Sequence, residues 1–539
     1  MKEIKKNYIG AFLLSVIVLC ISIAGYRVLN LKYQNTGFDN GVEHTDFGLF
    51  LATQHALYVN DFDNASVMIN DVKSDHKIVK QTKNIADFFS GKMPEDAKSL
   101  KDSKDLVEGM IYDAYLIQND DWKSVYNRHN KDESILAAPL RIFSAVNQNR
   151  ITETKKFIDS LQTTDSWKSF VRGQIAVLRG DTDTAAKEFA NVHPEFMNVN
   201  DYLYLMSFYK HNEMFEDMEI LKNDFVAKLG GMYMVDYPDI PDWDNYTGYK
   251  NNMVFSIIQT ISHTQIMMYT DLSLMFLRFA QIISDTQNMD AIDYYLGQYY
   301  FNNSGDYESC FKKVNKSSPL YLFGKLKVAE KNQDSKTIQR IAWHNPLFIP
   351  AFLIAVNEHI KNGNKSAALS LVNRALKQRD LSDAGRIYFL KQRAHIYLMF
   401  NKPDKAQKDV SEIKNIIGNV TPDLMLLQAR IWEKQDKNLD TAYTYVMNLI
   451  KMNKSDVNAW DVLGLIVYKR EGINNALEIM EKIGGFSGNS SSVYEHLGDL
   501  YVQQGDKERA LRSYKHALDL SDDCMVVVPN VQKKIRKIK

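Results

Sequence analysis

Glycine and proline are scarce in this chain. Its 539 residues include only 25 glycines and 11 prolines, a share well below the roughly 12% of average proteins. Architectures rich in turns and β-strands consume these two residues. With 45% hydrophobic and 24% charged residues, the chain otherwise has the composition of a folded protein, which excludes wholesale disorder. The shortage therefore predicts helices joined by short loops.

A surplus of one charge is also missing. The 66 lysines and arginines balance the 66 aspartates and glutamates, whereas proteins that bind nucleic acid carry a basic excess. We therefore expect no nucleic-acid partner. The chain has no HExxH zinc motif, no CxxC pair and no GxxxxGK[ST] phosphate loop, and Gly484–Gly488 lacks the GxSxG spacing of a nucleophile loop. We expect no catalytic site, no cofactor and no metal, and hence no enzyme.

Cysteine is almost absent. Cys20 lies in an apolar run, and only Cys310 and Cys524 remain, more than 200 residues apart. These two allow one long-range disulfide or two unpaired thiols, and we favour the thiols.

The N-terminal 27 residues have the pattern of a membrane segment. Lys2, Lys5 and Lys6 precede an apolar run from Ile9 to Ala24, long enough as a helix to cross the ~30 Å hydrocarbon core. An uncleaved anchor and a signal peptide cleaved after Ala24 are both open. In either case the positive flank stays inside, so we expect residues beyond a spacer at 28–45 to be exported. The protein is then membrane-anchored with its bulk in the periplasm, or cleaved and periplasmic.

A repeat of about 34 residues fills the C-terminal third. Apolar and small residues recur with the same spacing after steps of 34, 34, 36 and 38 residues. A fixed period of this length is typical of stacked helix pairs. Small residues stand where two helices of one unit cross, and larger ones fill the space between units. The units, from the C-terminal one backwards, contain Tyr494, Leu497, Gly498, Tyr501, Ala510 and Tyr514; Trp460, Leu463, Gly464, Ala476 and Met480; Leu426, Ala429, Ala442 and Val446; Leu390, Ala394, Ala406 and Val410; and Phe352, Ala355, Ala368 and Val372.

This spacing resembles the tetratricopeptide repeat (TPR) family. The match is specific between Phe352 and Leu520, and weaker copies occur around Gly173, Gly297 and Leu49. The resemblance implies an all-α solenoid of antiparallel helix pairs wound as a right-handed superhelix, with an N-terminal transmembrane or signal helix added. In layout the chain is similar to long exported TPR proteins of alphaproteobacteria.

The repeats divide the chain into segments. We predict degenerate helical repeats over 46–229, middle repeats over 253–345, a regular array over 346–522 and a basic tail over 523–539. Residues 230–252 carry two prolines, several aspartates and many aromatics, and we interpret them as a loop. The loop is a structural plug, a ligand-contacting segment or, through Asp242 and Asp244, an ion site. The tail is either a solvated, fraying end or a contact for anionic lipid or acidic protein.

The first helix of each repeat lines the inner face of a TPR solenoid, so its outward positions are candidates for partner binding. They are Lys391, His395, Asp461, Tyr468, Glu495 and Asp499. The Lys/Asn/Arg clamp that holds a C-terminal carboxylate in some TPR domains is missing. A solvated groove without a ligand is the alternative.

Together these features favour a non-enzymatic scaffold or assembly factor in the bacterial cell envelope, which binds a protein or peptide in its concave groove. The alternative is an accessory or regulatory subunit of an envelope biosynthetic enzyme or secretion system.

Overall fold

The computed structural model describes residues 45–228, 240–263, 271–284, 290–303, 305–379, 381–486, 490–523 and 531–538. Within these ranges the regular elements are all helices, and no strand occurs, as the scarcity of glycine and proline predicts. None of these helices is both long and apolar enough to cross a membrane. The predicted anchor or signal segment, and the spacer up to residue 44, lie outside the described residues.

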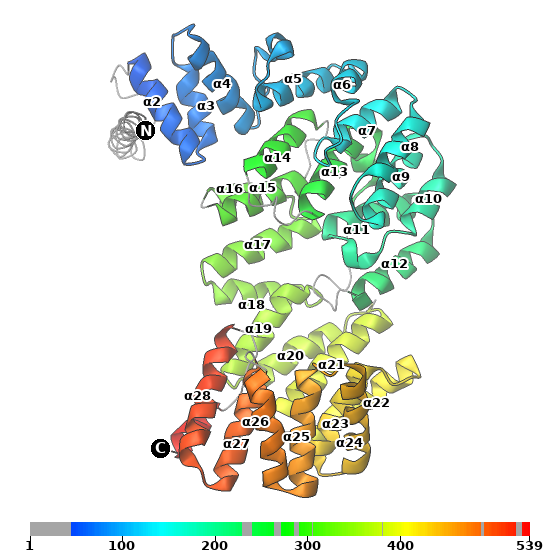
Figure 1. The fold of residues 1–539 in the computed structure, drawn as a ribbon, viewed down its shortest axis with the longest axis vertical. Coiled ribbons are helices and arrows are strands. Elements are labelled where there is room, and N and C mark those ends of the chain that lie inside the picture. Colours follow the sequence, from blue (N-terminus) through cyan, green and yellow to red (C-terminus); the bar gives the residue numbers. More distant parts are fainter. Residues whose placement is uncertain are drawn as a thin grey trace, which may run out of the picture. The chain divides into compact units, whose positions relative to one another are not determined.

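The chain divides into two compact units. The first comprises Met1–Met218 and Asp239–Lys325, and the second Glu219–Pro238 and Leu326–Lys539. Figure 1 shows the helices of both units. The division falls inside α17 (Pro319–Lys331).

Unit 1 begins with helices that contact their sequence neighbours from α2 to α10. Gly173 of α9 shows why they fit, because a β-carbon there would collide with the Phe189 ring of α10. The helices are α2 Asp46–Tyr58, α3 Phe62–Asn70, α4 Lys77–Phe89, α5 Leu106–Gln118, α6 Trp122–His129, α7 Ala138–Asn147, α8 Ile151–Ser160, α9 Asp165–Leu178, α10 Thr182–Phe189, α11 Val199–His211, α13 Gly248–His263, α14 Asp271–Ile283, α15 Asp290–Asn302 and α16 Tyr307–Lys313, with 3-10 helices η1 Ala97–Asp102, η2 Pro194–Phe196 and η3 Trp243–Tyr246. Helix α12, Phe215–Lys228, is divided between the units after Met218.

Helices α13 and α14 depart from simple stacking. They lie at the start of the predicted middle repeats, but they pack back against α7 and α9 and against α4 and α5, respectively. Gln118 of α5 donates a 2.7 Å hydrogen bond to the Ile282 carbonyl of α14. Because α13 begins at Gly248, the prediction of a loop up to residue 252 is wrong for its last five residues.

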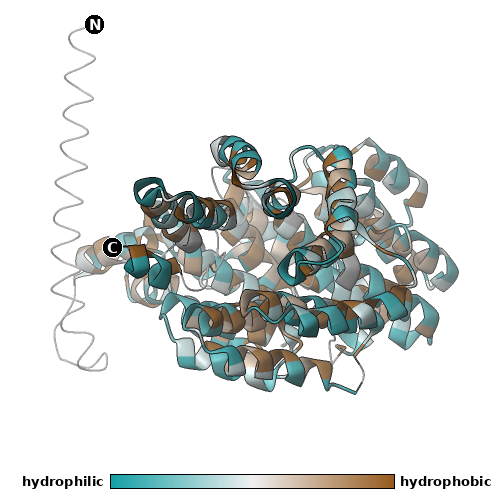
Figure 2. Cartoon of the chain, turned by 90° about the horizontal axis from the view of Figure 1, so that it is seen from below, coloured by the Kyte–Doolittle hydropathy of each residue, from teal (hydrophilic) through white to brown (hydrophobic). Residues whose placement is uncertain are grey.

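Unit 2 is a regular array. Its helices are α18 Ser335–His344, α19 Ile349–Lys361, α20 Lys365–Leu376, α21 Asp383–Met399, α22 Pro403–Ile417, α23 Pro422–Gln435, α24 Leu439–Met452, α25 Val457–Glu471, α26 Ile473–Phe486, α27 Ser491–Gln504, α28 Lys507–Asp523 and α29 Val531–Ile538. We call α19, α21, α23, α25 and α27 the A helices, and the helix after each one its B helix. Each A helix packs against its B helix, and the B helices α20, α22, α24 and α26 pack against the next A helix. Figure 2 shows apolar and polar residues on opposite sides of single helices.

The small residues stand at the helix crossings, as the repeat predicts. The small residue of each A helix and that of each B helix are buried in all five pairs: Ala355, Ala394, Ala429, Gly464 and Gly498 in the A helices, and Ala368, Ala406, Ala442, Ala476 and Ala510 in the B helices. A β-carbon on Gly498 would collide with the Tyr514 ring, and one on Gly464 with Met480. Gly505 adopts φ +88° in the turn after α27, which glycine does without strain.

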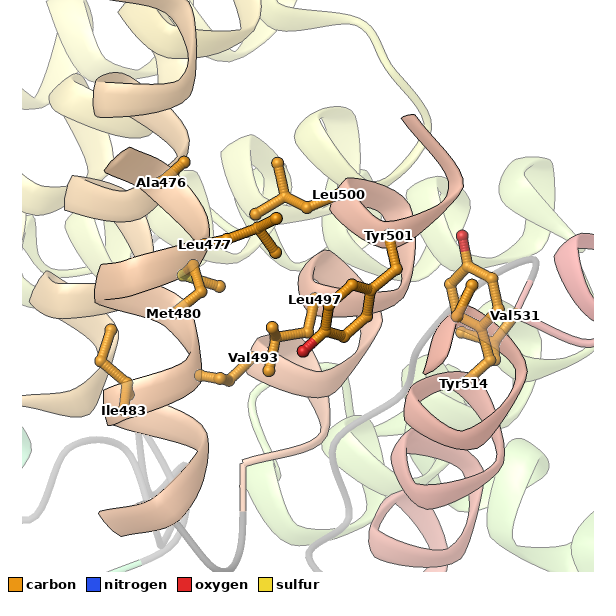
Figure 3. Packing of buried hydrophobic residues seen from close by; sticks show 11 residues of the cluster. Ala476, Leu477, Met480, Ile483, Val493, Leu497, Leu500, Tyr501, Tyr514 and Val531 are labelled. Atoms are coloured by element: carbon orange, nitrogen blue, oxygen red, sulfur yellow. The ribbon is translucent and has the colours of Figure 1, made fainter. Parts of the chain in front are cut away.

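The C-terminal segment is not a fraying tail in its described part. Residues 531–538 form α29, and Val531 belongs to the last core cluster together with Leu497, Tyr501 and Tyr514 (Figure 3). Ile535 and Ile538 pack against the same cluster. These three apolar residues recur at helical spacing and give α29 an apolar face. Helix α29 therefore packs against the core although its composition is basic.

Candidate functional site

The candidate surface consists of the A-helix residues that do not point toward their own B helix. Successive A helices α21, α23, α25 and α27 contact one another, so their exposed side chains form one continuous face, which we call the A face. Relative to the buried small residue of each helix, Lys391, Asp461 and Glu495 stand three positions before it, and His395 and Asp499 one position after it. The predicted site residues therefore occupy equivalent places, apart from Tyr468.

Helix α23 is shifted by one residue against the simple period. Its small residue is Ala429, which lies 35 residues after Ala394 and 35 before Gly464. Two residues with positive φ, Asp436 and Asn438, form the turn after α23. The shift buries Leu427 and Ile431 in the core and brings Arg430 to the A face.

Ion pairs bridge each successive pair of A helices from α21 onward. We call this series the A-face ladder. Its contacts are Lys391–Asp423 at 3.5 Å between α21 and α23, Arg430–Asp461 at 3.7 Å between α23 and α25, Asp461–His496 at 2.8 Å between α25 and α27, and Lys534 with Glu495 at 2.8 Å and Asp499 at 2.7 Å between α27 and α29. Four of the six predicted site residues are therefore engaged in contacts within the chain.

Asp461 is the centre of the ladder. Its side chain is fully buried, and besides His496 and Arg430 it accepts a 3.4 Å hydrogen bond from the Ser492 hydroxyl. Burial alone would raise the pKa of Asp461, but the His496 charge and hydrogen bond, with Arg430, outweigh it and hold the pKa below the usual value. Burial alone would likewise lower the pKa of His496, but Asp461 and Glu495 raise it above 6.5. Asp461 is thus a structural carboxylate rather than an exposed contact.

Lys391 and His395 are the part of the predicted site that faces solvent. His395 is exposed, and Lys391 is partly exposed beside the highly exposed Asp423. The dense protein surroundings, together with the charges of Arg430 and Lys391, lower the pKa of His395 to about 4, although its side chain keeps contact with water. His395 is therefore neutral near pH 7. The two cations at the α21–α23 end of the A face, Lys391 and Arg430, pair with Asp423 and Asp461, respectively.

Tyr468 does not belong to this open face. It is partly buried and packs against the core cluster of the last two repeats. Its ring fills space between units, which is the structural role that the repeat spacing predicts for the larger residues of each unit.

Glu495 and Asp499 form an acidic end of the A face, but a helix of the same chain covers them. Lys534 of α29 bonds to both carboxylates, and its ammonium lies 5.7 Å from the centroid of the Tyr514 ring. Tyr514 donates a 2.5 Å hydrogen bond to Asp499. Burial lowers the pKa of Lys534, but the two carboxylates raise it by more, so the net shift is upward.

Two residues of the candidate site were not predicted from the sequence, Arg430 and Lys534. Arg430 was missed because helix α23 is shifted by one residue against the repeat period. Lys534 was hidden by the basic composition around it, although Val531 lies 34 residues after Leu497, as Leu497 lies 34 after Leu463.

The aromatic segment before α13 packs inside unit 1. The ring centroids of Trp243 and Tyr246 lie 5.3 Å and 5.0 Å from that of Tyr204 of α11. Ser207 donates a 2.6 Å hydrogen bond to the Pro241 carbonyl. Residues 240–247 therefore pack against α11 in the way that the plug hypothesis predicts. No group of three or more potential metal ligands occurs among the described residues, which include Asp242 and Asp244; residues 229–239 lie outside them.

Comparison with known proteins gives similarity in structure only. No protein family matches the chain, and no curated protein does. A tetratricopeptide repeat protein from Parabacteroides merdae is 14% identical over 46% of this chain and 91% of its own, with a TM-score of 0.32. Cut9–Hcn1 of the APC/C is 14% identical over 92% and 90%, with a TM-score of 0.30, and yeast Tom70 is 12% identical over 88% and 92%, with a TM-score of 0.27. In its own repeat spacing and helix pairing, the chain resembles tetratricopeptide repeat proteins.

Proposed function

We propose that the protein is a non-enzymatic scaffold that binds a protein or peptide on the A face of unit 2. The observation that carries the proposal is the α21–α23 end of that face, where the partly exposed Lys391 and Arg430 lie on the same face as the exposed His395. Side chains at these places are not needed to fill the core. Exposed charge steers and orients a partner of opposite charge.

The partner segment that fits this end is extended or helical and acidic. The Lys391 ammonium lies 3.5 Å from the carboxylate of Asp423, which is highly exposed. A carboxylate of the partner can therefore replace Asp423 at little cost in free energy. A mixed polar surface of this kind suits a transient interaction better than an obligate apolar interface.

The location belongs to the proposal as well. The basic flank and apolar run before residue 27 support export, which would place the A face outside the cytoplasm in the cell envelope. An accessory subunit of an envelope biosynthetic enzyme or secretion system remains the second candidate, and the identity of the captured partner distinguishes the two.

Co-purification from detergent-solubilised membranes tests the proposal. The double variant Lys391→Glu/His395→Glu should lose the partner that the wild type retains, while helical content stays unchanged. Lys408→Glu, on the exposed side of the B helix α22, is the matched control and should retain it. Full retention by the double variant would contradict binding at this end. Charge reversal at Glu495 and Asp499 is a poorer test, because it first breaks their bonds to Lys534.

A further inference from the structure

Helix α29 occupies the place at which another repeat would begin. Val531 stands one repeat period after Leu497, and α29 packs against α28 and the last core cluster. Figure 3 shows Val531 beside the Tyr514 ring. The last helix pair of the array thus has α29 as its neighbour.

The contacts define what the site accepts. The apolar part consists of Leu497, Tyr501 and Tyr514, and the acidic part of Glu495 and Asp499. We call these five residues the acceptor site. An occupant needs apolar residues at i, i+4 and i+7 and a lysine at i+3, because α29 presents Val531, Lys534, Ile535 and Ile538 in that order. These positions share one face of a helix.

Helix α29 is bound only weakly to the last repeat. It has only eight residues, and isolated helices of that length are not stable in water. Val531 is its one fully buried side chain in the cluster, whereas Lys533, Arg536 and Lys537 are exposed. Its two ion pairs reach partly exposed carboxylates and are open to screening by salt.

We propose that the acceptor site binds a basic amphipathic helix of a protein partner, and that α29 occupies it within the chain as an internal competitor. The partner helix carries the same i, i+3, i+4, i+7 pattern and displaces α29. Binding is then limited by opening of α29, so a free acceptor site binds more tightly than the whole chain does. The inference rests on the proposed scaffold function for the existence of a partner. It concerns the α27 end of the A face, which is acidic, and therefore a basic partner segment.

Fluorescence anisotropy with a labelled synthetic peptide of residues 529–539 tests it on full-length protein. The double variant Val531→Asp/Lys534→Glu opens the site, and Lys533→Glu is the control on the exposed side of α29. We expect the peptide to bind the opened variant at least about tenfold more tightly than the wild type or Lys533→Glu. A further Glu495→Lys change should remove that gain, as should a peptide with glutamate in place of Lys534.

Equal binding to the wild type and the opened variant would overturn the proposal, and so would a gain that survives Glu495→Lys. If the double variant loses helical content in helices other than α29, the single variant Lys534→Gln replaces it. That variant must also bind the peptide more tightly than the wild type and Lys533→Glu do. Wild-type dimers that Lys534→Glu abolishes would assign the site to a second copy and overturn the partner assignment. Because only this chain and a synthetic peptide are used, failure here is separate from loss of co-purification through Lys391 and His395.

Discussion

Asp461 and His496 join two successive repeats through a 2.8 Å hydrogen-bonded ion pair, with the carboxylate fully buried. A charge buried in this way is tolerated only while its partners remain. The pair therefore couples the fold of α25 to that of α27, and it makes the last repeats sensitive both to substitution and to pH.

Asp461→Asn should destabilise unit 2 by about 1–3 kcal/mol, because it removes a buried negative charge that pairs with both His496 and Arg430. Asp423→Asn is the matched control: its carboxylate also pairs with a cation of a neighbouring A helix, but it is highly exposed, and such pairs contribute only about 0–1 kcal/mol. Urea unfolding of both variants checks the difference. Equal losses of unfolding free energy in the two variants would show that the burial of Asp461 does not strengthen its contribution to stability.

The stability of the last repeats should depend on pH through His496. Its pKa in the fold is raised above 6.5, so its contribution is complete below that value and is lost as pH rises through the folded pKa. Asp461 has a lowered pKa, so its contribution is present above 3.8 and is lost as pH falls through its folded pKa. His496 therefore adds more to the free energy of unfolding at about pH 6 than at about pH 8. His395, whose pKa is lowered to about 4, acts in the opposite direction, so the comparison has to be made between the wild type and a His496 variant.

His496→Gln should lower the free energy of unfolding more at about pH 6 than at about pH 8, whereas His344→Gln, which changes an exposed histidine of α18, should leave the pH dependence of the wild type unchanged. Denaturant melts at both pH values measure the two effects. A loss through His496→Gln that is equal at both pH values would contradict the assignment of His496.

Gly498→Ala should destabilise the last repeat by about 1–3 kcal/mol through overpacking. Its β-carbon would meet the Tyr514 ring, which the hydrogen bond to Asp499 holds in place. Gly485→Ala adds the same methyl group where no atom lies within 4 Å, and it should be neutral or slightly stabilising because alanine favours helix. Thermal melts that rank the two variants in the opposite order would show that the crossing has room.

Ala476→Leu and Ala510→Leu should each cost about 1–3 kcal/mol, because both alanines are fully buried where A and B helices cross. Lys515→Leu places the same side chain on the exposed side of α28 and should change stability by less than about 0.5 kcal/mol. If neither alanine variant differs from Lys515→Leu in denaturant melts, the repeat register is wrong.

Export remains a prediction, because residues 1–44 lie outside the described residues. A topology reporter fused after Gly41 should be active outside the cytoplasm, since the lysines before the apolar run stay inside. Activity only in the cytoplasm would rule export out. Release of the protein by alkaline carbonate would favour a cleaved signal peptide over an anchor.

The crossings of unit 2 could be predicted because they impose one residue type. Only a small side chain fits opposite Tyr514 or Met480, so Gly498 and Gly464 mark the register directly. Helix α23 keeps the predicted small residue Ala429 at the crossing, but it departs by one residue from a strict 34-residue step to Gly464. No side chain signals this shift, which brings Arg430 to the A face.

The candidate site was predicted by position but not by environment. Spacing places Asp461 and Glu495 on equivalent turns of their helices, yet one is buried by neighbours and the other is bonded to Lys534. Those partners come from other repeats and from α29, so the period of one helix does not reveal them. The packing of α13 against α7 and α9 was likewise not predictable, because it joins segments far apart in the sequence.

Site-specific photo-crosslinking tests the central claim, that the A face of unit 2 binds a protein partner, most directly. A photoreactive phenylalanine at His395 should capture a discrete partner in intact cells, and the same residue at Lys408 on the B helix α22 should not. Loss of the adduct in the Lys391→Glu background would tie it to the α21–α23 end of the A face. Capture at Lys408 with none at His395 would place binding on another surface and contradict the claim.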